Sequence, residues 1–446
     1  MKVSVIGTGY VGLVSGVCLA AKGHDITCVD VDQAKVDRIN AGDPPIYEVG
    51  LEDLLKQTIG RTLRATTDLP AAVQESELSL IAVGTPFDGS AIDLKYIRTV
   101  AAEIGAVLKD KPSYHTVVVK STVVPGTTEV VVLPILEETS GKRAGVDFGV
   151  GMNPEFLKEG EAIADFMSPD RIVLGGIDER SIDALEALYA DFQEVDKIRT
   201  NLHTAEMIKY TANALLATLI SFSNEIGNLC ARVGVDVLEA MAGVHLDKRF
   251  SPIMESGDRI SPASLTYLAA GCGFGGSCFP KDVKALIAYG QAAGARMDLL
   301  QSVITVNEAQ PAKMLEMLKK HFPDLEGRRI AVLGMAFKPG TDDIRESPAL
   351  PVTAKLLEEK AIVTSFDPLA RHEAEKVFGA AVDFHDDLAG AIEGVDAILL
   401  MTRWPQFNAL PAMIKDAAPP PLVIDGRRML AKANLRRYEG IGLKSA

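Results

Sequence analysis

The chain has 446 residues, of which 47% are hydrophobic and 24% are charged, and its net charge is −14. This length predicts two or three domains, each large enough to bury a core of its own. The acidic balance argues against nucleic acid or an anionic membrane as a general partner, so an anionic ligand would need a local cluster of Lys and Arg. No apolar stretch approaches the length that we expect of a membrane span.

The cysteines and histidines indicate neither disulfides nor a metal site. Five cysteines are scattered along the chain, at positions 18, 28, 230, 272 and 278, and none has the spacing of metal ligands. The seven histidines form no cluster. An odd, dispersed set of thiols is typical of a reduced compartment, so we expect a cytoplasmic protein with no metal.

Strands and helices alternate in the first part of the chain. Apolar runs predict strands at 2–6, 25–29, 78–83 and 116–120, and near 147–151 and 171–175. Helical spacing predicts helices at 11–22, around 93–108 and near 127–139. This alternation is typical of parallel βαβ units in an open sheet.

Residues 203 to about 242 are expected to be helical almost throughout. Apolar residues alternate spacings of four and three there and form one seam, made of Ile208, Ala212, Leu215, Leu219, Phe222, Ile226 and Leu229. A long helix with this heptad-like seam would link two domains and could pack against its copy in a dimer. A single helix buried within its own chain explains the pattern equally well.

The α/β pattern returns from Arg328. Strands are expected at 329–333, 361–366, 397–401 and 422–424, with a helix at about 347–359. The strands that end at Asp30 and Asp367 would each close a βαβ unit. We therefore predict an α/β protein in which a long central helix and a helical middle domain join two Rossmann-like, doubly wound domains.

The segment 7–12, Gly-Thr-Gly-Tyr-Val-Gly, lies between a predicted strand and a predicted helix, as a dinucleotide fingerprint requires. Gly7 allows the tight turn, Gly9 gives a pyrophosphate room, and Gly12 lets helix and strand pack. Asp30 follows at the right distance to accept hydrogen bonds from the adenosine ribose. A carboxylate there, with Asp32 close by, would repel a 2′-phosphate, so we expect NAD rather than NADP.

The segment 273–282, Gly-Phe-Gly-Gly-Ser-Cys-Phe-Pro-Lys-Asp, places Cys278 just ahead of a predicted helix. Pro280 suits the first helical position. The helix dipole and the nearby Lys281 both favour a thiolate, and the glycines would let a substrate approach the sulfur. The alternative is a buried cysteine in a Gly-rich turn. Together with the fingerprint, the segment indicates an oxidoreductase that forms a covalent thio-adduct.

Several polar residues could serve such a thiol. Lys209 and Asn213 share one face of the long helix, where an ammonium and an amide would make an oxyanion site, or else lie solvated on the surface. Glu155 and Glu159 are each candidates to position water or act as a general base, although a surface salt bridge explains Glu159 as well. Asp282 could hold a water or Lys209, or be a plain first-turn acid.

Loops that follow predicted strands supply further candidates, because open α/β sheets bind ligands there. Thr85-Pro86 and Ser121-Thr122 follow two strands of the first domain. Lys338 and Arg427 follow strands of the last domain and are candidates to hold a diphosphate.

Taken together, these segments resemble the UDP-glucose 6-dehydrogenase family. The motifs that carry the resemblance are GTGYVG at 7–12, VGTP at 83–86, KSTVVPGT at 120–127, NPEFLKEGEAIADF at 153–166, EMIKYTANALLA at 206–217, GFGGSCFPKD at 273–282, FKPGTDDIRESP at 337–348 and DGRR at 425–428. The resemblance implies an N-terminal NAD-binding domain over 1–200, a central helical domain over 201–310 and a C-terminal UDP-sugar-binding domain over 311–446.

Members of the family oxidise the C6 alcohol of the sugar to a carboxylate with two NAD and one water. The resemblance implies that Cys278 traps the aldehyde as a thiohemiacetal, which is oxidised to a thioester and hydrolysed to UDP-glucuronate. It implies that Lys209 and Asn213 stabilise the oxyanion. Asp282 and Thr122 match the pair that organises water.

Glu155 matches a proposed base of the family. The predicted substrate-binding residues are Glu155, Phe156, Leu157, Lys158, Lys209, Asn213, Arg259, Tyr267, Gly275, Phe337, Lys338 and Arg427. The predicted NAD-binding residues are Gly7, Gly9, Tyr10, Val11, Gly12, Asp30, Lys35, Thr85, Pro86, Ser121, Thr122, Glu159, Lys281 and Arg345. UDP-glucose is the expected substrate, and a homodimer or higher homo-oligomer is the expected assembly.

Three other functions stay open. The same chemistry could act on GDP-mannose or a UDP-N-acetylhexosamine, and Tyr267-Leu268 with the following Gly-containing segment is similar to the GDP-mannose relatives. A catalytically silent nucleotide-sugar sensor would be expected to lack Cys278 or Lys209, and both are present. A one-step dehydrogenase would use Lys209 as a base without any thiol.

Overall fold

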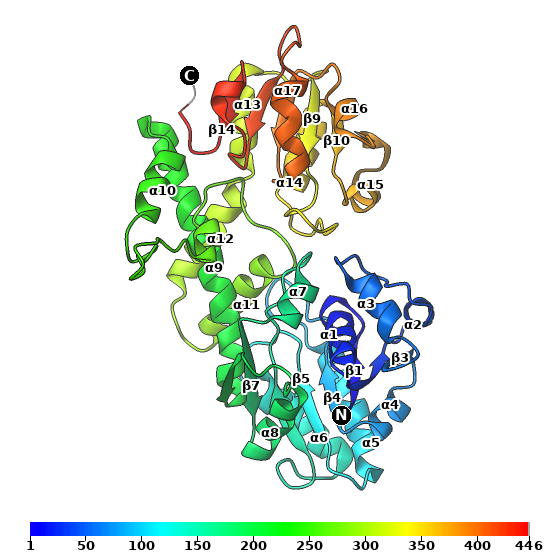
Figure 1. The fold of residues 1–446 in the computed structure, drawn as a ribbon. Helices are drawn as coiled ribbons and strands as arrows, with labels where there is room; N and C mark the ends of the chain where they lie inside the picture. The colour runs from blue at the N-terminus through cyan, green and yellow to red at the C-terminus, as the bar shows by residue number, and fades with distance from the viewer. Residues whose placement is uncertain (445–446) are drawn as a thin grey trace. The chain divides into compact units, whose positions relative to one another are not determined.

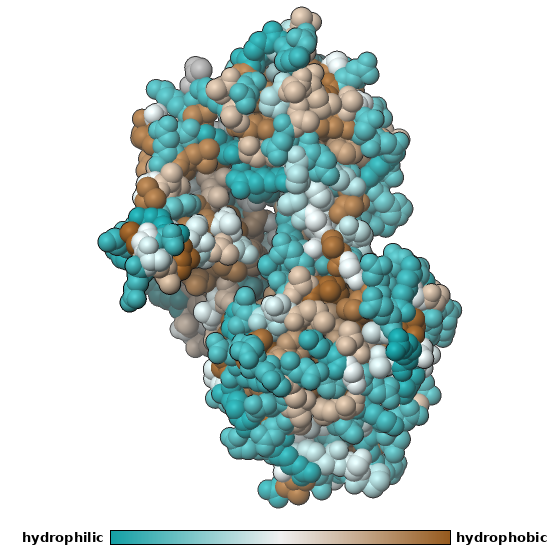
Figure 2. Space-filling model, in the orientation of Figure 1, coloured by the Kyte–Doolittle hydropathy of each residue, from teal (hydrophilic) through white to brown (hydrophobic). Residues whose placement is uncertain are grey.

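The computed structural model describes residues 1–444 and divides into two compact units, Met1–Ala212 and Asn213–Ala446 (Figure 1). Each unit contains one sheet with helices on it. On the face drawn in Figure 2 hydrophilic residues predominate, with apolar residues scattered among them.

The first unit is built on an eight-stranded sheet with the order β3-β2-β1-β4-β5-β6-β7-β8. Its strands are β1 (Lys2–Ile6), β2 (Asp25–Val29), β3 (Leu63–Thr66), β4 (Leu78–Ile81), β5 (Thr116–Val119), β6 (Gly149–Met152), β7 (Arg171–Gly176) and β8 (Asp196–Thr200). Strands buried on both faces are apolar almost throughout. Because β4 and β5 are buried in this way, they could be predicted from the sequence.

Helices cover both faces of this sheet. One core lies under α1 (Tyr10–Ala21), α2 (Gln33–Asn40), α3 (Leu51–Thr58), α7 (Ala162–Met167) and α8 (Glu179–Leu188). The other core lies under α4 (Leu69–Glu75), α5 (Lys95–Asp110) and α6 (Leu133–Ser140). A π-helical turn, η1 (Thr128–Val132), leads directly into α6. The unit is therefore doubly wound, as predicted.

The sheet differs from the predicted all-parallel one between β6 and β7, which pair antiparallel. The connection between these strands holds only the short helix α7, and an antiparallel pair needs no full crossover. As a result the segment after β6 runs beside β7. Asn153 donates from Nδ2 to the carbonyl of Val173 at 2.9 Å, and the Arg171 guanidinium lies 4.0 Å from the ring centroid of Phe156.

The boundary between the units falls inside α9 (Leu202–Val233). The helices that follow are α10 (Val237–His245), η2 (Ala263–Tyr267), α11 (Phe279–Ala292), α12 (Asp298–Ala309) and α13 (Ala312–His321). They confirm the predicted helical middle of the chain.

The sheet of the second unit has six parallel strands in the order β11-β10-β9-β12-β13-β14. Its strands are β9 (Arg329–Leu333), β10 (Ile362–Phe366), β11 (Val382–Phe384), β12 (Ala397–Leu400), β13 (Leu422–Asp425) and β14 (Tyr438–Gly440). Its own helices are α14 (Ala349–Glu358), α15 (Arg371–Phe378), α16 (Leu388–Ile392) and α17 (Leu410–Met413). The predicted pair of Rossmann-like domains is confirmed.

Three residues of the apolar seam of α9 are exposed on the surface of the single chain. Leu215, Phe222 and Leu229 follow one another at intervals of seven and are 58%, 52% and 54% exposed. This helix is also long and apolar enough, by length and composition, to cross a membrane, which corrects the expectation that no stretch approaches that length. Helices that pack inside proteins pass the same test.

Candidate active site

The loop between β1 and α1 has the shape that a bound pyrophosphate needs. Gly7 has φ +98°, and a Cβ on Gly12 would lie 1.8 Å from the carbonyl oxygen of Gly7, so only glycine fits both positions. A Cβ on Gly9 would meet nothing within 4 Å, which leaves the approach to α1 open. No side chain caps α1, so its first N–H groups are available to a phosphate. The loop therefore fits a dinucleotide.

Asp30 follows β2 and faces this loop. Its Oδ2 accepts hydrogen bonds from the Thr8 backbone N–H at 2.9 Å and the Thr8 hydroxyl at 2.6 Å, and its Oδ1 accepts from the Asp32 N–H at 3.0 Å. Burial raises the pKa of Asp30, but these hydrogen bonds and the nearby Lys35 outweigh burial and bring it below the ordinary value. A carboxylate is thus held ionised beside the predicted ribose position.

The predicted residues after β4 and β5 lie together. The Thr85 hydroxyl donates to the carbonyl of Thr122 at 2.8 Å, and the Ser121 hydroxyl donates to the carbonyl of Val83 at 2.7 Å. All these residues follow the carboxyl ends of adjacent strands, where ligands of open α/β sheets bind.

Lys209 and Glu155 form a buried ion pair in the first unit. The Lys209 Nζ lies 2.9 Å from Glu155 Oε1, and Glu155 Oε2 accepts from the Leu157 N–H at 2.7 Å. Lys209 is only 3% exposed, which excludes the solvated alternative. Burial raises the pKa of Glu155, and the charge and hydrogen bond of Lys209 more than reverse this, so the carboxylate stays ionised. The Lys209 ammonium also lies 5.5 Å from the centroid of the Phe156 ring.

A second buried lysine, Lys120, belongs to the same region and was not predicted. Its Nζ donates to Asn153 Oδ1 at 2.8 Å, and the Tyr189 hydroxyl donates to the same oxygen at 2.6 Å. Burial lowers the pKa of Lys120 to about 8, with Glu155 opposing and Lys209 adding to the shift. Lys120 opens the KSTVVPGT motif, which was the one signal that could have identified it.

Glu206 is another buried acid that sequence reasoning missed. Its Oε1 accepts from the Thr128 N–H at 2.9 Å and the Thr128 hydroxyl at 2.6 Å, and its Oε2 accepts from the Gly126 N–H at 2.5 Å. Burial raises its pKa above the ordinary value. Glu206 lies three residues before Lys209 on α9, so it ties the loop after β5 to the helix that carries Lys209.

Glu48 joins two predicted binding loops and was also missed. It accepts a hydrogen bond from the Tyr10 hydroxyl, from the Gly160 N–H at 2.6 Å and from the Ala162 N–H at 2.9 Å. Burial and Glu48 both raise the pKa of Tyr10. The Tyr10 side chain of the fingerprint is thereby fixed to the segment that contains Glu159.

In the second unit Cys278 occupies the N-cap position of α11. The helix begins at Phe279, so Pro280 is its second residue rather than its first. One turn later the buried Asp282 accepts from Asn213 Nδ2 at 2.6 Å and from Lys281 Nζ at 2.6 Å. Asn213 and Asp282, at 7% and 1% exposed, are not surface residues, and in this unit Asp282 holds an amide and an ammonium.

The glycines before Cys278 allow close packing inside the second unit. A Cβ on Gly275 would lie 2.2 Å from the carbonyl oxygen of Glu346, and a Cβ on Gly276 would lie 2.8 Å from the Phe337 ring. The Gly276 N–H donates to the carbonyl of Arg345 at 2.8 Å. The predicted residues of the last domain thus lie against the cysteine loop.

The remaining predicted substrate residues are dispersed within their units. Arg427 donates from Nε to the carbonyl of Met401 at 2.6 Å and from Nη1 to that of Gly273 at 3.0 Å, next to the cysteine loop. Arg259 instead donates to the carbonyls of Leu246 and Ser251, in an exposed loop.

Three more predicted residues have identified neighbours. The Tyr267 ring lies 6.2 Å from that of Phe279, and the Lys338 ammonium lies 5.9 Å from the Phe337 ring centroid. Lys158 pairs with Glu161 and Asp165 on the surface of the first unit.

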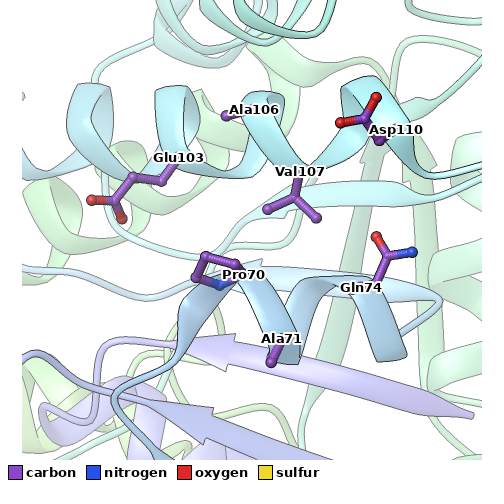
Figure 3. Close-up of a pocket in the computed structure, with 7 residues that line it drawn as sticks. All are labelled: Pro70, Ala71, Gln74, Glu103, Ala106, Val107 and Asp110. Carbon is purple, nitrogen blue, oxygen red and sulfur yellow. The ribbon is translucent and has the colours of Figure 1, made fainter.

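A groove elsewhere on the first unit contains none of the predicted site residues. It has a volume of about 580 Å³ and lies between α4 and α5, lined by Pro70, Ala71, Gln74, Glu103, Ala106, Val107 and Asp110 (Figure 3). None of these residues was a predicted site residue, and its polar groups do not converge as a binding site requires. Within residues 1–444 no group of three His, Cys, Asp or Glu side chains could hold a metal ion.

The two units offer complementary chemistry. The first presents an open dinucleotide loop together with a buried ammonium that is paired with a carboxylate. The second presents a thiol at a helix N-terminus, one turn from a buried amide–carboxylate pair, and it is the one cysteine in the described chain that is not buried. These groups suit hydride transfer, oxyanion stabilisation and nucleophilic attack by sulfur.

Comparison with known proteins yields matches along most of the chain. Residues 1–193, 203–309 and 331–432 match the NAD binding domain, the central domain and the UDP binding domain of the UDP-glucose/GDP-mannose dehydrogenase family. The UDP-glucose 6-dehydrogenase AglM of Haloferax volcanii is 42% identical over 99% of this chain and 100% of its own. The GDP-mannose 6-dehydrogenase of Pseudomonas putida is 42% identical over 92% of this chain and 93% of its own.

The fold comparison agrees. The solved UDP-glucose dehydrogenase of Pyrobaculum islandicum is 39% identical and superposes with a TM-score of 0.90, covering 99% of this chain and 97% of that one.

Proposed function

The chain belongs to the UDP-glucose/GDP-mannose dehydrogenase family, and we propose that it oxidises the C6 alcohol of UDP-glucose to a carboxylate, using two NAD and one water. The predicted family and cofactor are confirmed, since the matched domains cover most of the chain and the first is the NAD binding domain. The finer proposal is carried by one observation, the placement of Cys278 at the N-cap of α11, one turn before the Asn213–Asp282 pair.

In the proposed reaction the sugar alcohol is first oxidised to an aldehyde. The Cys278 sulfur then adds to the aldehyde carbon and gives a thiohemiacetal, whose own oxidation gives a thioester. Water attacks the thioester, the carbon–sulfur bond breaks, and UDP-glucuronate leaves with the thiol restored. Bound NAD supplies the hydride acceptor for each oxidation. Covalent capture keeps the aldehyde from escaping between the two oxidations.

The buried polar side chains have distinct roles in this proposal. Lys209, whose ammonium is fixed by Glu155, stabilises the oxyanion of the tetrahedral species, and Asn213 donates its amide to the same oxygen. Glu155 is the candidate base, and its ionised state suits it to accept a proton. Asp282 and Thr122 are the residues that we expect to organise the hydrolytic water.

Binding divides between the units in the same proposal. The fingerprint glycines and Asp30 hold NAD, with Thr85 and Ser121 at the adjacent strand ends. Lys338 and Arg427 bind the diphosphate of the nucleotide sugar, and the UDP binding domain match over residues 331–432 supports this assignment.

The stoichiometry of the reaction tests the proposal. UDP-glucose should yield two NADH per sugar oxidised, measured at the end point of a reaction with limiting sugar. One NADH per sugar would leave the aldehyde as the product and remove the thioester from the mechanism. No NADH from UDP-glucose at any concentration would overturn the substrate assignment.

GDP-mannose is the second candidate substrate, because the GDP-mannose 6-dehydrogenase of Pseudomonas putida is as identical to this chain as the UDP-glucose enzyme of Haloferax volcanii is. A panel of UDP-glucose, GDP-mannose and UDP-N-acetylhexosamines, compared by kcat/KM, separates the two. We expect UDP-glucose to lead, and a higher kcat/KM for GDP-mannose would reverse the assignment.

We also propose that the enzyme is a homodimer in which α9 packs against its copy. Leu215, Phe222 and Leu229 form an exposed apolar stripe whose heptad-like spacing suits a helix of the same sequence. Phe222→Asp should shift the mass measured by light scattering toward that of a single chain, whereas the wild type should show at least twice that mass. A monomeric wild type would contradict the proposal, and partition of the wild type into vesicles would favour a membrane contact instead.

Two further predictions from the sequence, besides the roles of the site residues, also need a test. The domain boundaries near 200 and 310 are one, and limited proteolysis at those positions would test it. The cytoplasmic location is the other, and fractionation of cells that express the chain would test it.

A further inference from the structure

Side-chain amides from two helices hold the glycine-rich segment that leads to Cys278. Asn307 of α12 accepts from the Phe274 N–H on Oδ1 at 2.8 Å and donates from Nδ2 to the Phe274 carbonyl at 3.0 Å. Gln310, one turn later, donates to the carbonyl of Gly271 at 2.8 Å. Asn224 of α9 accepts from the Gly271 N–H at 2.8 Å. All these residues belong to the second unit.

The contact made by Asn307 has a specific chemical requirement. One planar amide satisfies both the donor and the acceptor of a single residue, as a neighbouring strand would. An aspartate in this place keeps the acceptor but loses the donor, and an alanine loses both. The backbone also has to come close, because Gly273 has φ +105° and a Cβ there would lie 3.1 Å from Asn307 Oδ1.

Packing connects this contact to the thiol. The Phe274 ring meets the Phe279 ring edge to face, with centroids 6.0 Å apart and planes at 81°. Phe279 is the first residue of α11 and follows Cys278 directly. The Tyr267 ring, 6.2 Å from Phe279, supports the same side chain. A shift of the Phe274 backbone would therefore move the first turn of α11.

We propose that Asn307 is a positioning residue for the thiol of Cys278: by holding Phe274 it fixes, through the Phe274–Phe279 contact, where the sulfur stands at the N-terminus of α11. The inference rests on the proposed role of Cys278 as the nucleophile. The field of a helix end falls off within its first turn, so a small displacement of the sulfur weakens the stabilisation of the thiolate. Asn307 itself need not touch the substrate.

Labelling of the free enzyme with 2,2′-dipyridyl disulfide across pH tests the proposal. In the described chain Cys18, Cys28, Cys230 and Cys272 are buried and Cys278 is not, so the fast phase of labelling reports on Cys278. In Asn307→Ala we expect the pH midpoint of labelling to rise and the rate at neutral pH to fall about tenfold, because the helix end no longer favours the thiolate.

Asn307→Asp provides a test that does not depend on the alanine variant folding well. At neutral pH its carboxylate would face the Phe274 carbonyl and repel it, so labelling should slow as in the alanine variant. When acid protonates this carboxyl, it can again donate to the carbonyl, and the labelling rate should return toward that of the wild type at the same pH. A general loss of structure would give no such recovery.

Gln301→Ala is the matched control on the same helix. Gln301 is exposed and accepts a hydrogen bond from Gln291, away from the cysteine loop. This variant should label and turn over like the wild type. If both Asn307 variants keep the labelling profile of the wild type, or if the aspartate variant shows no recovery in acid, Asn307 does not position the thiol. The assay needs neither sugar nor NAD, so a wild type that fails to oxidise UDP-glucose overturns the proposed function and leaves this test intact.

Discussion

The two sheets share one strand order around their central strands, yet only the first has a dinucleotide loop. In both, the strand next to the first one ends at an aspartate, Asp30 after β2 and Asp367 after β10. Asp30 is partly open and accepts hydrogen bonds from only two residues, Thr8 and Asp32. Asp367 is 4% exposed and accepts from five groups, the N–H groups of Met335, Ala336, Leu369 and Ala370 and the Nε1 of Trp404.

The turns after β1 and β9 explain this difference. Gly7 and Gly334 are equivalent, each with a positive φ beside the next strand of the sheet. Where the first turn continues with the open Gly9 and enters α1 at once, the second continues with the buried Ala336, and α14 begins only at Ala349. Because no helix begins at this turn, the second domain lacks the helix N–H groups on which the pyrophosphate of a dinucleotide would rest. Turn chemistry, rather than strand order, therefore decides what a Rossmann-like domain binds.

Removal of the Cys278 thiol should stop the chemistry of the second unit and leave cofactor binding in the first unit unchanged. Cys278→Ala should lower turnover of UDP-glucose at least about a thousandfold, the size seen when a nucleophile is removed. NAD affinity, measured by titration calorimetry, should be unchanged. Cys230→Ala, which alters a buried cysteine of α9, should retain turnover. A Cys278→Ala variant with most of its activity would contradict the assignment of the nucleophile.

Asp367→Ala should destabilise the second unit by about 3 kcal/mol, because it leaves buried N–H groups without an acceptor. Trp404 is the one tryptophan of the chain and donates to Asp367, so its fluorescence during urea unfolding reports on this region directly. Asp383→Ala removes an exposed carboxylate from the same sheet and should change the free energy of unfolding by less than about 0.5 kcal/mol. Equal effects of the two changes would refute the structural role of Asp367.

Asp30→Ala should weaken the binding of NAD rather than destabilise the fold. We expect the Kd for NAD to rise about tenfold, as the loss of a charged hydrogen bond implies, and the discrimination against NADP to fall. Both constants are measurable by fluorescence titration. Asp367→Ala, tested in parallel, should keep the wild-type preference. An unchanged preference in Asp30→Ala would place the ribose elsewhere.

The dependence of stability on pH tests a buried histidine of the first sheet. His115 is buried with Nε2 2.8 Å from the Ser79 hydroxyl, and burial, with the charge of Lys111, lowers its pKa to about 3. The folded-state pKa lies below the unfolded value, so the unfolded state takes up the proton first. The contribution of His115 is complete above about pH 6.5 and declines by up to about 1.4 kcal/mol per unit as the pH falls toward 3.

Opening free energies of β4 and β5, obtained from hydrogen exchange between pH 4 and pH 7, measure this effect. His115→Gln should flatten the slope, and His372→Gln, at an exposed histidine of the second unit, should leave it unchanged. An unaltered slope in His115→Gln would show that other groups cause the acid sensitivity.

Much of the fold was predictable because buried parallel strands are short apolar runs. The predicted strands at 2–6 and 329–333 coincide with β1 and β9. Strand β8 (Asp196–Thr200) was missed because it is a largely exposed edge strand with the sequence Asp-Lys-Ile-Arg-Thr. The antiparallel direction of β7 was missed because the sequence of a strand does not encode the direction of its neighbour.

Only those residues of the candidate site that lie in local sequence motifs could be predicted. Cys278, Lys209 and Asn213 were identified from local patterns, but their burial and partners depend on the tertiary structure. Glu206 accepts hydrogen bonds from Gly126 and Thr128, which lie in a distant part of the chain. The spacing of residues in the sequence therefore does not reveal this contact. The partners of Glu48 and Lys120 are equally remote in sequence.

The covalent intermediate is the most direct test of the proposed reaction. Asp282→Asn, in which we expect hydrolysis to be slow, would be mixed with UDP-glucose and NAD, quenched in acid and digested for mass spectrometry. We expect a UDP-glucuronyl group on the peptide that contains Cys278, formed together with NADH. Formation of NADH without any sugar on that peptide would contradict sulfur as the carrier of the intermediate.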